Sequence, residues 1–236
     1  MPRIYIVIAT FLPNVGGAEK QALAHGRSLR EKDFAATILT LRHKRQWARR
    51  EEIEGVPVIR VGGMMLGDRE RMPALLRKLG YLMGLLIMIW TLWLQRRNYD
   101  ALHLYQLGLL TLPVSVVCLL THKPLLISVR AANAAQAETS QTPTLLIAGP
   151  LDAHTSWLRV HERTRVSGDL ESLERLGTIA VHFTRLLLKG IHATVVILSS
   201  QMKDYLATHD FLLPNTHLIP NGVDTTRFTP TAMFSA

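Results

Sequence analysis

The chain has 236 residues, of which 48% are hydrophobic and 19% are charged, a composition that is typical of a globular protein and excludes a disordered one. Its formal net charge is +9, because 27 Lys and Arg stand against 18 Asp and Glu, so we expect attraction to an anionic partner. An aromatic content of 6% and the lack of a recognisable nucleic-acid motif argue against nucleic acid as that partner. An anionic membrane surface is another candidate, and a solvated basic surface without a partner is the alternative.

The single cysteine, Cys118, lies inside an apolar run and can form no internal disulfide. We therefore expect a reducing compartment, the cytoplasm, and a buried Cys118 that acts as a small hydrophobic residue rather than as a nucleophile. The first apolar run is short and enters a glycine turn instead of a cleavage site, so the sequence predicts no signal peptide.

The N-terminal stretch predicts a strand, a glycine turn and a helix. Residues 4–9 (IYIVIA) are typical of a strand that is buried on both faces of a parallel sheet, and a helix is expected over residues 18–31. Between them, Gly16 and Gly17 permit a positive φ and a close backbone approach. Because the first amides of the helix have no partner within it, this turn favours a site for an anion or for sugar hydroxyls.

The rest of the chain alternates strands with helices, which predicts an α/β fold with a parallel sheet. Further strands are expected over residues 36–41, 55–61, 100–104, 124–129, 194–198 and 217–219. Further helices are expected over residues 107–120, 169–189 and 201–209. Pro57 favours an edge position for its strand. Residues 131–166 follow no regular pattern and are expected to form a long loop.

Residues 79–94 (LGYLMGLLIMIWTLWL) contain no charged side chain, so the helix they predict is either buried or in contact with lipid. Sixteen residues would span about 24 Å, less than the ~30 Å of a hydrocarbon core, which disfavours a membrane-spanning helix. The flanking Arg77, Lys78, Arg96 and Arg97 could meet lipid headgroups. The segment therefore predicts peripheral binding at the inner face of a membrane, or a buried helix.

Several common active-site motifs are missing. The glycine pair does not form G-x-G-x-x-G, and Ala36 lies where a dinucleotide-binding protein would carry an acidic residue, although Arg42 keeps an NADP-type protein as an alternative. No P-loop, G-x-S-x-G elbow or metal-binding histidine spacing is present.

Arg130 leaves the carboxyl end of a predicted strand, where ligands bind in open α/β sheets. An arginine there suits a phosphate or a carboxylate, although a structural ion pair is an equal alternative. Asn133 follows it closely, and Asn221 begins a turn near the last strand. His103 lies within a strand and is expected to be a hydrogen-bonded core residue.

Four segments, FLPNVGGAEKQALAHGRSL, EEIEGVPVIRV, VVILSSQMKDYL and IPNGVDTTRF, together resemble the N-terminal half of a family 4 retaining glycosyltransferase of the GT-B type. The resemblance covers nearly the whole chain. It implies two Rossmann-like domains that face a cleft, with the acceptor on the N-terminal domain and a nucleotide sugar on the C-terminal one. Residues 1–220 would form the acceptor-side domain and 221–236 would begin the linker. The donor domain with its E-x7-E motif is not found before Ala236, so we expect a truncated chain that cannot transfer sugar alone.

By position, the resemblance places the glycine pair near the donor phosphate and the acceptor, and residues 221–224 at the start of the interdomain crossover. Many members carry a histidine where this chain has Arg130, so no catalytic residue is assigned. The predicted substrate-binding residues are Gly16, Gly17, Glu19, Arg130, Asn133, Asn221, Val223 and Asp224.

The resemblance implies hexosyl transfer from a nucleotide-diphosphate sugar, which is a substrate rather than a cofactor, to a glycan or lipid-linked acceptor. No metal or other cofactor is expected, and a separate chain could supply the donor domain. The alternative is a non-catalytic α/β module that binds a membrane or a partner through residues 79–94.

Overall fold

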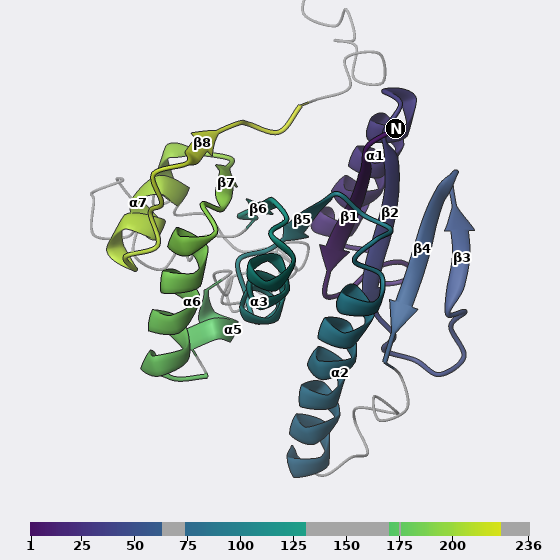
Figure 1. The fold of residues 1–236 in the computed structure, drawn as a ribbon, viewed down its shortest axis with the longest axis horizontal. Helices are drawn as coiled ribbons and strands as arrows, with labels where there is room; N and C mark the ends of the chain where they lie inside the picture. Colours follow the sequence, from purple (N-terminus) through teal and green to yellow (C-terminus); the bar gives the residue numbers. More distant parts are fainter. Residues whose placement is uncertain (63–73, 131–169, 175, 223–236) are drawn as a thin grey trace, which may run out of the picture.

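The computed structural model describes residues 1–62, 74–130, 170–174 and 176–222, which form one open sheet with helices on both faces (Figure 1). The sheet has eight strands in the order β3-β4-β2-β1-β5-β6-β7-β8, and all neighbours are parallel except β3 with β4. The strands are β1 (Arg3–Ile8), β2 (Ala35–Leu41), β3 (Arg50–Ile53), β4 (Val56–Val61), β5 (Ala101–Tyr105), β6 (Leu125–Ser128), β7 (Thr194–Ile197) and β8 (Thr216–Leu218). The helices described are α1 (Gly17–Glu31), α2 (Ala74–Leu94), α3 (Thr111–Thr121), α5 (Glu171–Glu174), α6 (Thr178–Gly190) and α7 (Ser200–Thr208). The predicted Rossmann-like α/β architecture is confirmed.

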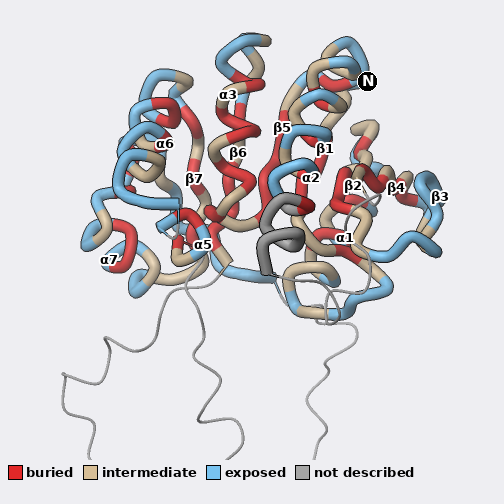
Figure 2. The backbone as a smooth tube through the Cα atoms, turned by 90° about the horizontal axis from the view of Figure 1, so that it is seen from below, coloured by how far each residue is buried: buried red, intermediate tan, exposed pale blue. Residues whose placement is uncertain are grey.

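β1 lies at the centre of the sheet because its residues are buried on both faces. Ile6 and Ile8 belong to the apolar cluster under α1, whereas Tyr5 and Val7 belong to the cluster on the opposite face. α1 lies on one side of the sheet, and α2, α3 and α6 lie side by side on the other (Figure 2). Tyr205 and Leu206 of α7 belong to the same apolar cluster as Leu188 of α6. Alternate side chains of β1 point to opposite faces of the sheet, so this strand contributes to the core on both faces.

The order of the strands reverses beside β1. After β1 the chain builds β2 and β4 on one side, and it then returns to place β5 and β6 on the other side. In open α/β sheets, ligands bind outside the carboxyl ends of the strands at such a reversal. The loop after β1 and the first turns of α1 therefore lie where a ligand is expected.

α1 approaches the sheet closely at Gly26. A Cβ atom at this position would lie 3.1 Å from Cγ1 of Val56, which is tighter than an ordinary van der Waals contact. Ala22, Leu23 and Gly26 are the buried residues of the helix, whereas Ala18 and Leu29 are only partly covered. The small residues let the helix backbone lie near β4.

The sequence analysis did not predict β3. Because β3 pairs with the outer side of β4, Pro57 in β4 does not lie on an edge strand, and that prediction is wrong. β3 pairs with β4 in a hairpin whose turn holds Glu54 and Gly55 at positive φ values of 48° and 78°. Pro57 is tolerated inside the sheet because the pairing of β4 with β2 begins only at Val58, so its missing amide breaks no bond of that ladder.

α2 is buried on one side and exposed on the other. Met88 and Leu92 are fully buried in the core, where each contributes roughly 1.5–3 kcal/mol, while Leu86 and Trp90 are 50% and 62% exposed. Neither of the two predictions for this segment, burial or lipid contact, describes the whole helix. No helix in the part of the chain that the structure describes is long and apolar enough to cross a membrane.

The second half of the sheet follows the predictions with two differences. The helix expected over residues 169–189 is divided into α5 and α6, because Gly177 takes a φ of 97° just before α6 begins. α3 begins at Thr111, four residues later than predicted. α7 begins with a side-chain cap, since the Ser199 hydroxyl accepts a hydrogen bond from the Met202 amide at 3.4 Å.

Cys118 is buried in α3, as predicted, and burial raises the pKa of its thiol to about 12. The thiol is therefore not a nucleophile near neutral pH. The expected long loop at residues 131–166 lies outside the described residues.

Candidate functional site

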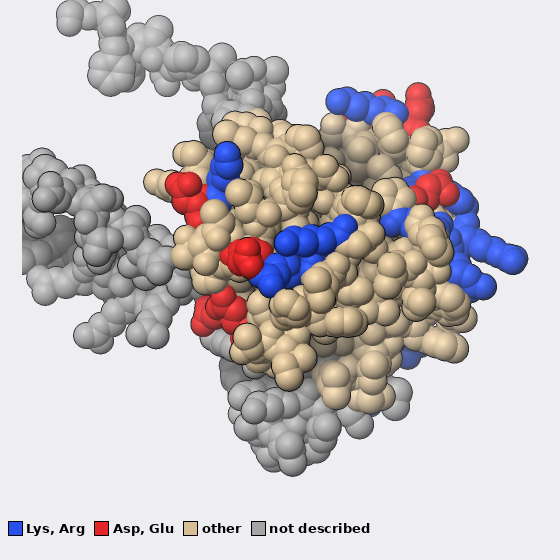
Figure 3. All heavy atoms as spheres, turned by 60° about the vertical axis from the view of Figure 1, so that its left-hand side comes forward, with Lys and Arg blue, Asp and Glu red and all other residues tan. Residues whose placement is uncertain are grey.

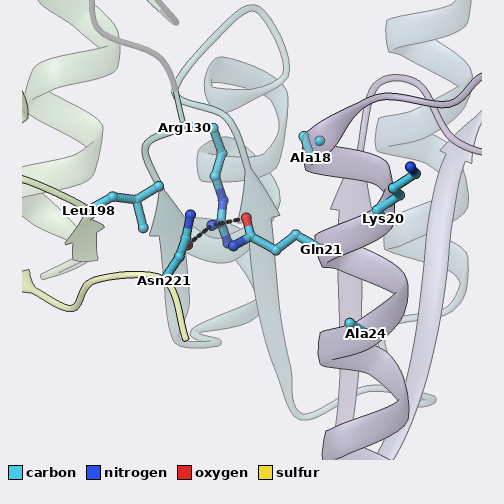
Figure 4. Close-up of a pocket in the computed structure, with 8 residues that line it drawn as sticks. Ala18, Lys20, Gln21, Ala24, Arg130, Leu198 and Asn221 are labelled. Atoms are coloured by element: carbon cyan, nitrogen blue, oxygen red, sulfur yellow. Dashed lines mark hydrogen bonds between the residues drawn. The ribbon is translucent and has the colours of Figure 1, made fainter. Parts of the chain in front are cut away.

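A pocket of about 470 Å³ opens where the first turns of α1 face the carboxyl ends of β6, β7 and β8 (Figure 4). Its walls come from three distant parts of the chain. The lining residues are Gly17, Ala18, Lys20, Gln21, Ala24, Arg130, Leu198 and Asn221. The position agrees with the rule that ligands of open α/β sheets bind at the carboxyl ends of the strands.

Arg130 points into this pocket, and two of the groups that hold it are neutral amides. Its Nη1 donates a hydrogen bond to Oε1 of Gln21 and another to Oδ1 of Asn221 at 3.3 Å, and both side chains point toward the guanidinium in Figure 4. The guanidinium carbon lies 4.4 Å from the ring centroid of Tyr105, within the range of a cation–π contact. These contacts fix the plane and position of the guanidinium.

A layer of aromatic side chains extends inward from Arg130. The Tyr105 hydroxyl shares a hydrogen bond of 3.0 Å with Nδ1 of His25, and Nε2 of His103 lies 2.8 Å from the Ser128 hydroxyl. The two histidine rings are 4.9 Å apart in an edge contact, and His103 lies 4.7 Å from Tyr105. His103 is thus a hydrogen-bonded core histidine, as predicted.

Burial controls the ionisation of this layer. It lowers the pKa of His25, and it holds the pKa of His103 well below the usual value, with the neighbouring His25 and the positive Arg130 acting in the same direction. Burial also raises the pKa of Tyr105 to about 12, although Arg130 opposes this shift. Near neutral pH the layer therefore carries no charge.

The glycine loop differs from the expectation in its backbone. Gly16 is extended, with φ of −136° and ψ of 179°, and neither Gly16 nor Gly17 has a positive φ, so that part of the prediction is wrong. A Cβ atom at Gly16 would lie 2.4 Å from Oε2 of Glu19, so the end of that side chain would have to move. A Cβ atom at Gly17 would meet nothing within 4 Å and would extend into open space beside the pocket.

Glu19 braces the loop and is not among the residues that line the pocket. Its Oε1 accepts a hydrogen bond of 2.6 Å from the Thr10 hydroxyl, which ties the first turn of α1 to the end of β1. Of the other predicted residues, Gly17, Arg130 and Asn221 come together in the pocket. Asn133, Val223 and Asp224 lie outside the described residues.

Arg60 in β4 also anchors the glycine loop. Its side chain is 1% exposed, and Nη2 donates to the Leu12 carbonyl at 2.6 Å and pairs with Oε1 of Glu51 at 2.5 Å. Nη1 donates to the Ala48 carbonyl at 3.2 Å. His43 also contacts the segment between β1 and the glycine loop, since its Nε2 donates a hydrogen bond to the Ala9 carbonyl at 2.9 Å.

The sequence analysis did not identify Gln21, His25, Tyr105 or Arg60. A signal existed on α1, because Gly17, Gln21 and His25 are four residues apart and share one face of a helix. A second signal lay in β4, where Arg60 continues the inward alternation of Val56 and Val58. No group of His, Cys, Asp and Glu in the described ranges is arranged to hold a metal ion.

The strand order and the position of the pocket are those of the N-terminal domain of a GT-B glycosyltransferase. Residues 16–222 match the glycosyl transferase 4-like domain, and the chain belongs to this family. The resemblance inferred from the four sequence segments is thereby confirmed.

Solved structures share this fold. Sucrose-phosphate synthase from Thermosynechococcus elongatus is 13% identical with a TM-score of 0.60, and the match covers 98% of this chain and 51% of that one. HepE from Anabaena, solved in complex with UDP-glucose, is 12% identical with a TM-score of 0.53 over 95% of this chain and 45% of that one. The chain thus spans about half the length of either protein. No curated protein matches the chain.

Proposed function

We propose that the chain is the acceptor-side half of a retaining glycosyltransferase, which transfers a hexosyl group from a nucleotide-diphosphate sugar to a glycan or lipid-linked acceptor. The observation that carries this proposal is the pocket between α1 and Arg130, at the carboxyl ends of the strands, in a chain of this family. The UDP-glucose bound to HepE supports a nucleotide sugar as donor.

Retaining transfer requires stabilisation of the leaving diphosphate and of an oxocarbenium-like transition state. The described groups of this chain contribute binding and orientation. The amides that begin α1 have no side-chain cap and would donate hydrogen bonds to the oxygen atoms of a ligand, and Arg130 supplies a positive charge held in one plane. A second domain would close the cleft, exclude water and bring the donor, so turnover needs both halves.

The purified chain is expected to release no nucleotide diphosphate from any nucleotide sugar, with or without an acceptor. A coupled assay for nucleotide release over a panel of nucleotide sugars measures this. Release above the rate of a chain-free control would contradict the need for a second half.

A positive test requires the donor half. The DNA beyond the Ala236 codon is read in all three frames, and a following Rossmann-like domain with an E-x7-E segment is joined to this chain. The joined protein is expected to transfer sugar, and failure with every donor would overturn the proposed function.

The exposed side of α2 favours a membrane-bound acceptor. We define the α2 face as Leu82, Met83, Leu86, Ile87, Trp90 and Leu94, all of which are at least 36% exposed. Arg49 and Ile87 line one shallow pocket, and Arg96 stacks on Trp93 with the guanidinium carbon 4.8 Å from the ring. An apolar strip beside cations is suited to an anionic lipid surface.

The surface toward α6 and α7 is a second candidate for lipid contact, because Ile179, Phe183 and Leu186 of α6 are at least 50% exposed. However, it carries scattered charges of both signs on a mostly uncharged background (Figure 3). We therefore propose that the protein binds the inner face of the membrane through the α2 face, where it could reach a lipid-linked acceptor.

In a flotation assay, the chain is expected to be enriched on vesicles that contain phosphatidylserine over vesicles of phosphatidylcholine alone. Replacing Trp90 with glutamate should abolish this enrichment, because the charge enters the α2 face at a position that is 62% exposed. Ile179→Glu on α6 is the matched control, since Ile179 is 88% exposed and lies on another helix. Equal loss in both variants, or no enrichment of the unaltered chain, would remove the membrane proposal.

A further inference from the structure

A second pocket, of about 270 Å³, lies where the carboxyl end of β4 meets α2 (Figure 1), and we call it the β4–α2 pocket. Its lining residues are Arg49, Arg60, Val61, Gly62, Ile87 and Thr91. Gly62 takes a φ of 79°, and a Cβ atom there would lie 3.8 Å from Cα of Gly84 in α2, so the two backbones pass close together. The volume is below the roughly 300–1,000 Å³ of pockets for drug-sized ligands, so this pocket suits a small chemical group rather than a nucleotide sugar.

Arg49 supplies the available positive charge of the β4–α2 pocket, whose lining residues are two arginines and no carboxylate among uncharged groups. The charge of Arg60 is matched by Glu51, whose Oε1 lies 2.5 Å from Nη2. Arg49 is exposed, and within the part of the chain that the structure describes its side chain forms no ion pair or hydrogen bond. Its backbone is fixed, because the Arg49 carbonyl accepts a hydrogen bond of 2.8 Å from the Arg60 amide. An oxyanion in this pocket would therefore meet a guanidinium at a defined place in the sheet.

α2 contributes one polar and one apolar side chain to the same pocket. Ile87 and Thr91 are four residues apart, so they lie one above the other on the helix. The Thr91 hydroxyl is half-buried and can donate a hydrogen bond to an oxyanion. Ile87 also belongs to the α2 face. The pocket and this apolar surface therefore share a side chain, and a ligand that fills both must be an amphiphile.

We propose that the β4–α2 pocket binds the phosphate group of one lipid molecule, whose hydrocarbon chains lie along the α2 face. The phosphate would contact Arg49 and Thr91, because a guanidinium and a hydroxyl both donate to phosphate oxygens. The chains would cover apolar side chains that are otherwise in contact with water. This inference rests on the proposed binding of a lipid-linked acceptor and narrows it, since general attraction to an anionic surface needs no pocket.

The β4–α2 pocket lies at the same edge of the sheet as the pocket beside α1. β2, β1 and β5 separate the carboxyl ends of β4 and β6, and four strand spacings of about 4.8 Å amount to roughly 19 Å. A lipid-linked glycan that is held by its phosphate beside β4 would extend its sugars along this edge toward the start of α1. The phosphate site would thus hold the acceptor within reach of the position where transfer is proposed.

The test measures binding of soluble lipids to the 236-residue chain and needs neither vesicles nor turnover. Dioctanoyl phosphatidic acid is used below the concentration at which it forms micelles. Glycerol 3-phosphate has the same head without chains, and dioctanoyl phosphatidylcholine has the same chains with a zwitterionic head. Calorimetry is expected to show that phosphatidic acid binds at least about tenfold more tightly than either, because it alone offers both an open phosphate and apolar chains.

Four variants assign this binding to the pocket and to the α2 face. Arg49→Gln should remove the preference for phosphatidic acid over phosphatidylcholine, whereas Arg50→Gln should keep it, because Arg50 is exposed but does not line the pocket. Thr91→Val removes the hydroxyl and should weaken binding of phosphatidic acid without lowering the melting temperature. Trp90→Glu should remove the advantage of phosphatidic acid over glycerol 3-phosphate, because it places a charge where the chains would lie.

Three results would overturn the inference. Glycerol 3-phosphate could bind as tightly as phosphatidic acid, which would make the pocket a site for soluble phosphates. The two lipids could bind equally, or Arg50→Gln could weaken binding as much as Arg49→Gln, and either result would leave only general attraction. Flotation on anionic vesicles and transfer by the joined protein could still succeed in each case, so the proposed function and this inference fail separately.

Discussion

Replacing Glu51 with alanine is expected to lower the free energy of unfolding by about 3 kcal/mol, because it leaves the charge of Arg60 without its carboxylate. The guanidinium is almost completely buried, and Glu51 lies 2.5 Å from its Nη2. The Leu12 and Ala48 carbonyls and the Trp47 ring, 5.8 Å from the guanidinium carbon, remain as partners, but none of them neutralises the charge. Urea denaturation at neutral pH measures the difference.

Glu52→Ala provides a matched control on the same strand, because Glu52 is exposed and Arg60 bonds to its neighbour. Its effect should stay within about 0.5 kcal/mol. The double variant Arg60→Met with Glu51→Ala should lose less stability than the sum of the single variants, since it removes both charges together. If Glu51→Ala and Glu52→Ala unfold at the same urea concentration, the buried pair does not stabilise the fold.

The role of Arg60 also shows which parts of the fold could be predicted from local sequence. β1 and α1 were predicted because a β-branched run and a glycine turn are local signals. β3 has the sequence REEI, without apolar alternation, and it depends on pairing with β4 and on the Arg60–Glu51 contact. A strand that is stabilised mainly by pairing with its neighbour need not show a strand pattern in its own sequence.

The site was predictable where a general rule of parallel sheets applies. Gly17, Arg130 and Asn221 were each selected because they follow a strand or begin a helix at the carboxyl edge, and they do line one pocket. Gln21 and Tyr105 were missed, because their roles depend on Arg130, which lies 109 residues beyond Gln21. The exposed side of α2 was also beyond prediction, since an apolar helix does not reveal which of its sides another element covers.

Lowering the pH from 7.5 to 5 is expected to destabilise the protein progressively below about pH 6.5, through the buried histidines. The pKa of His103 is held well below 6.5 by burial, with His25 and Arg130 acting in the same direction, and the pKa of His25 is lowered by burial, Arg130 and Lys32. In the unfolded chain both imidazoles regain a pKa near 6.5 and bind protons that the folded state excludes. Their neutral contacts therefore contribute full stability above that pH, and the contribution falls by up to about 1.4 kcal/mol per pH unit for each histidine as the pH decreases.

The predicted loss of stability at low pH is tested by measuring the slope of the unfolding free energy against pH. His103→Gln should reduce the slope between pH 6.5 and 5 by close to one proton, whatever it does to stability at pH 7.5, because glutamine can bond to Ser128 but cannot bind a proton. His217→Gln, on the exposed end strand β8, is the control variant for a histidine that is not buried. A slope that is the same in the His103 and His217 variants would mean that the acid sensitivity of the protein arises elsewhere. A stability that increases as the pH falls would contradict the neutral state of the His25–His103 pair, and with it the uncharged layer beneath Arg130.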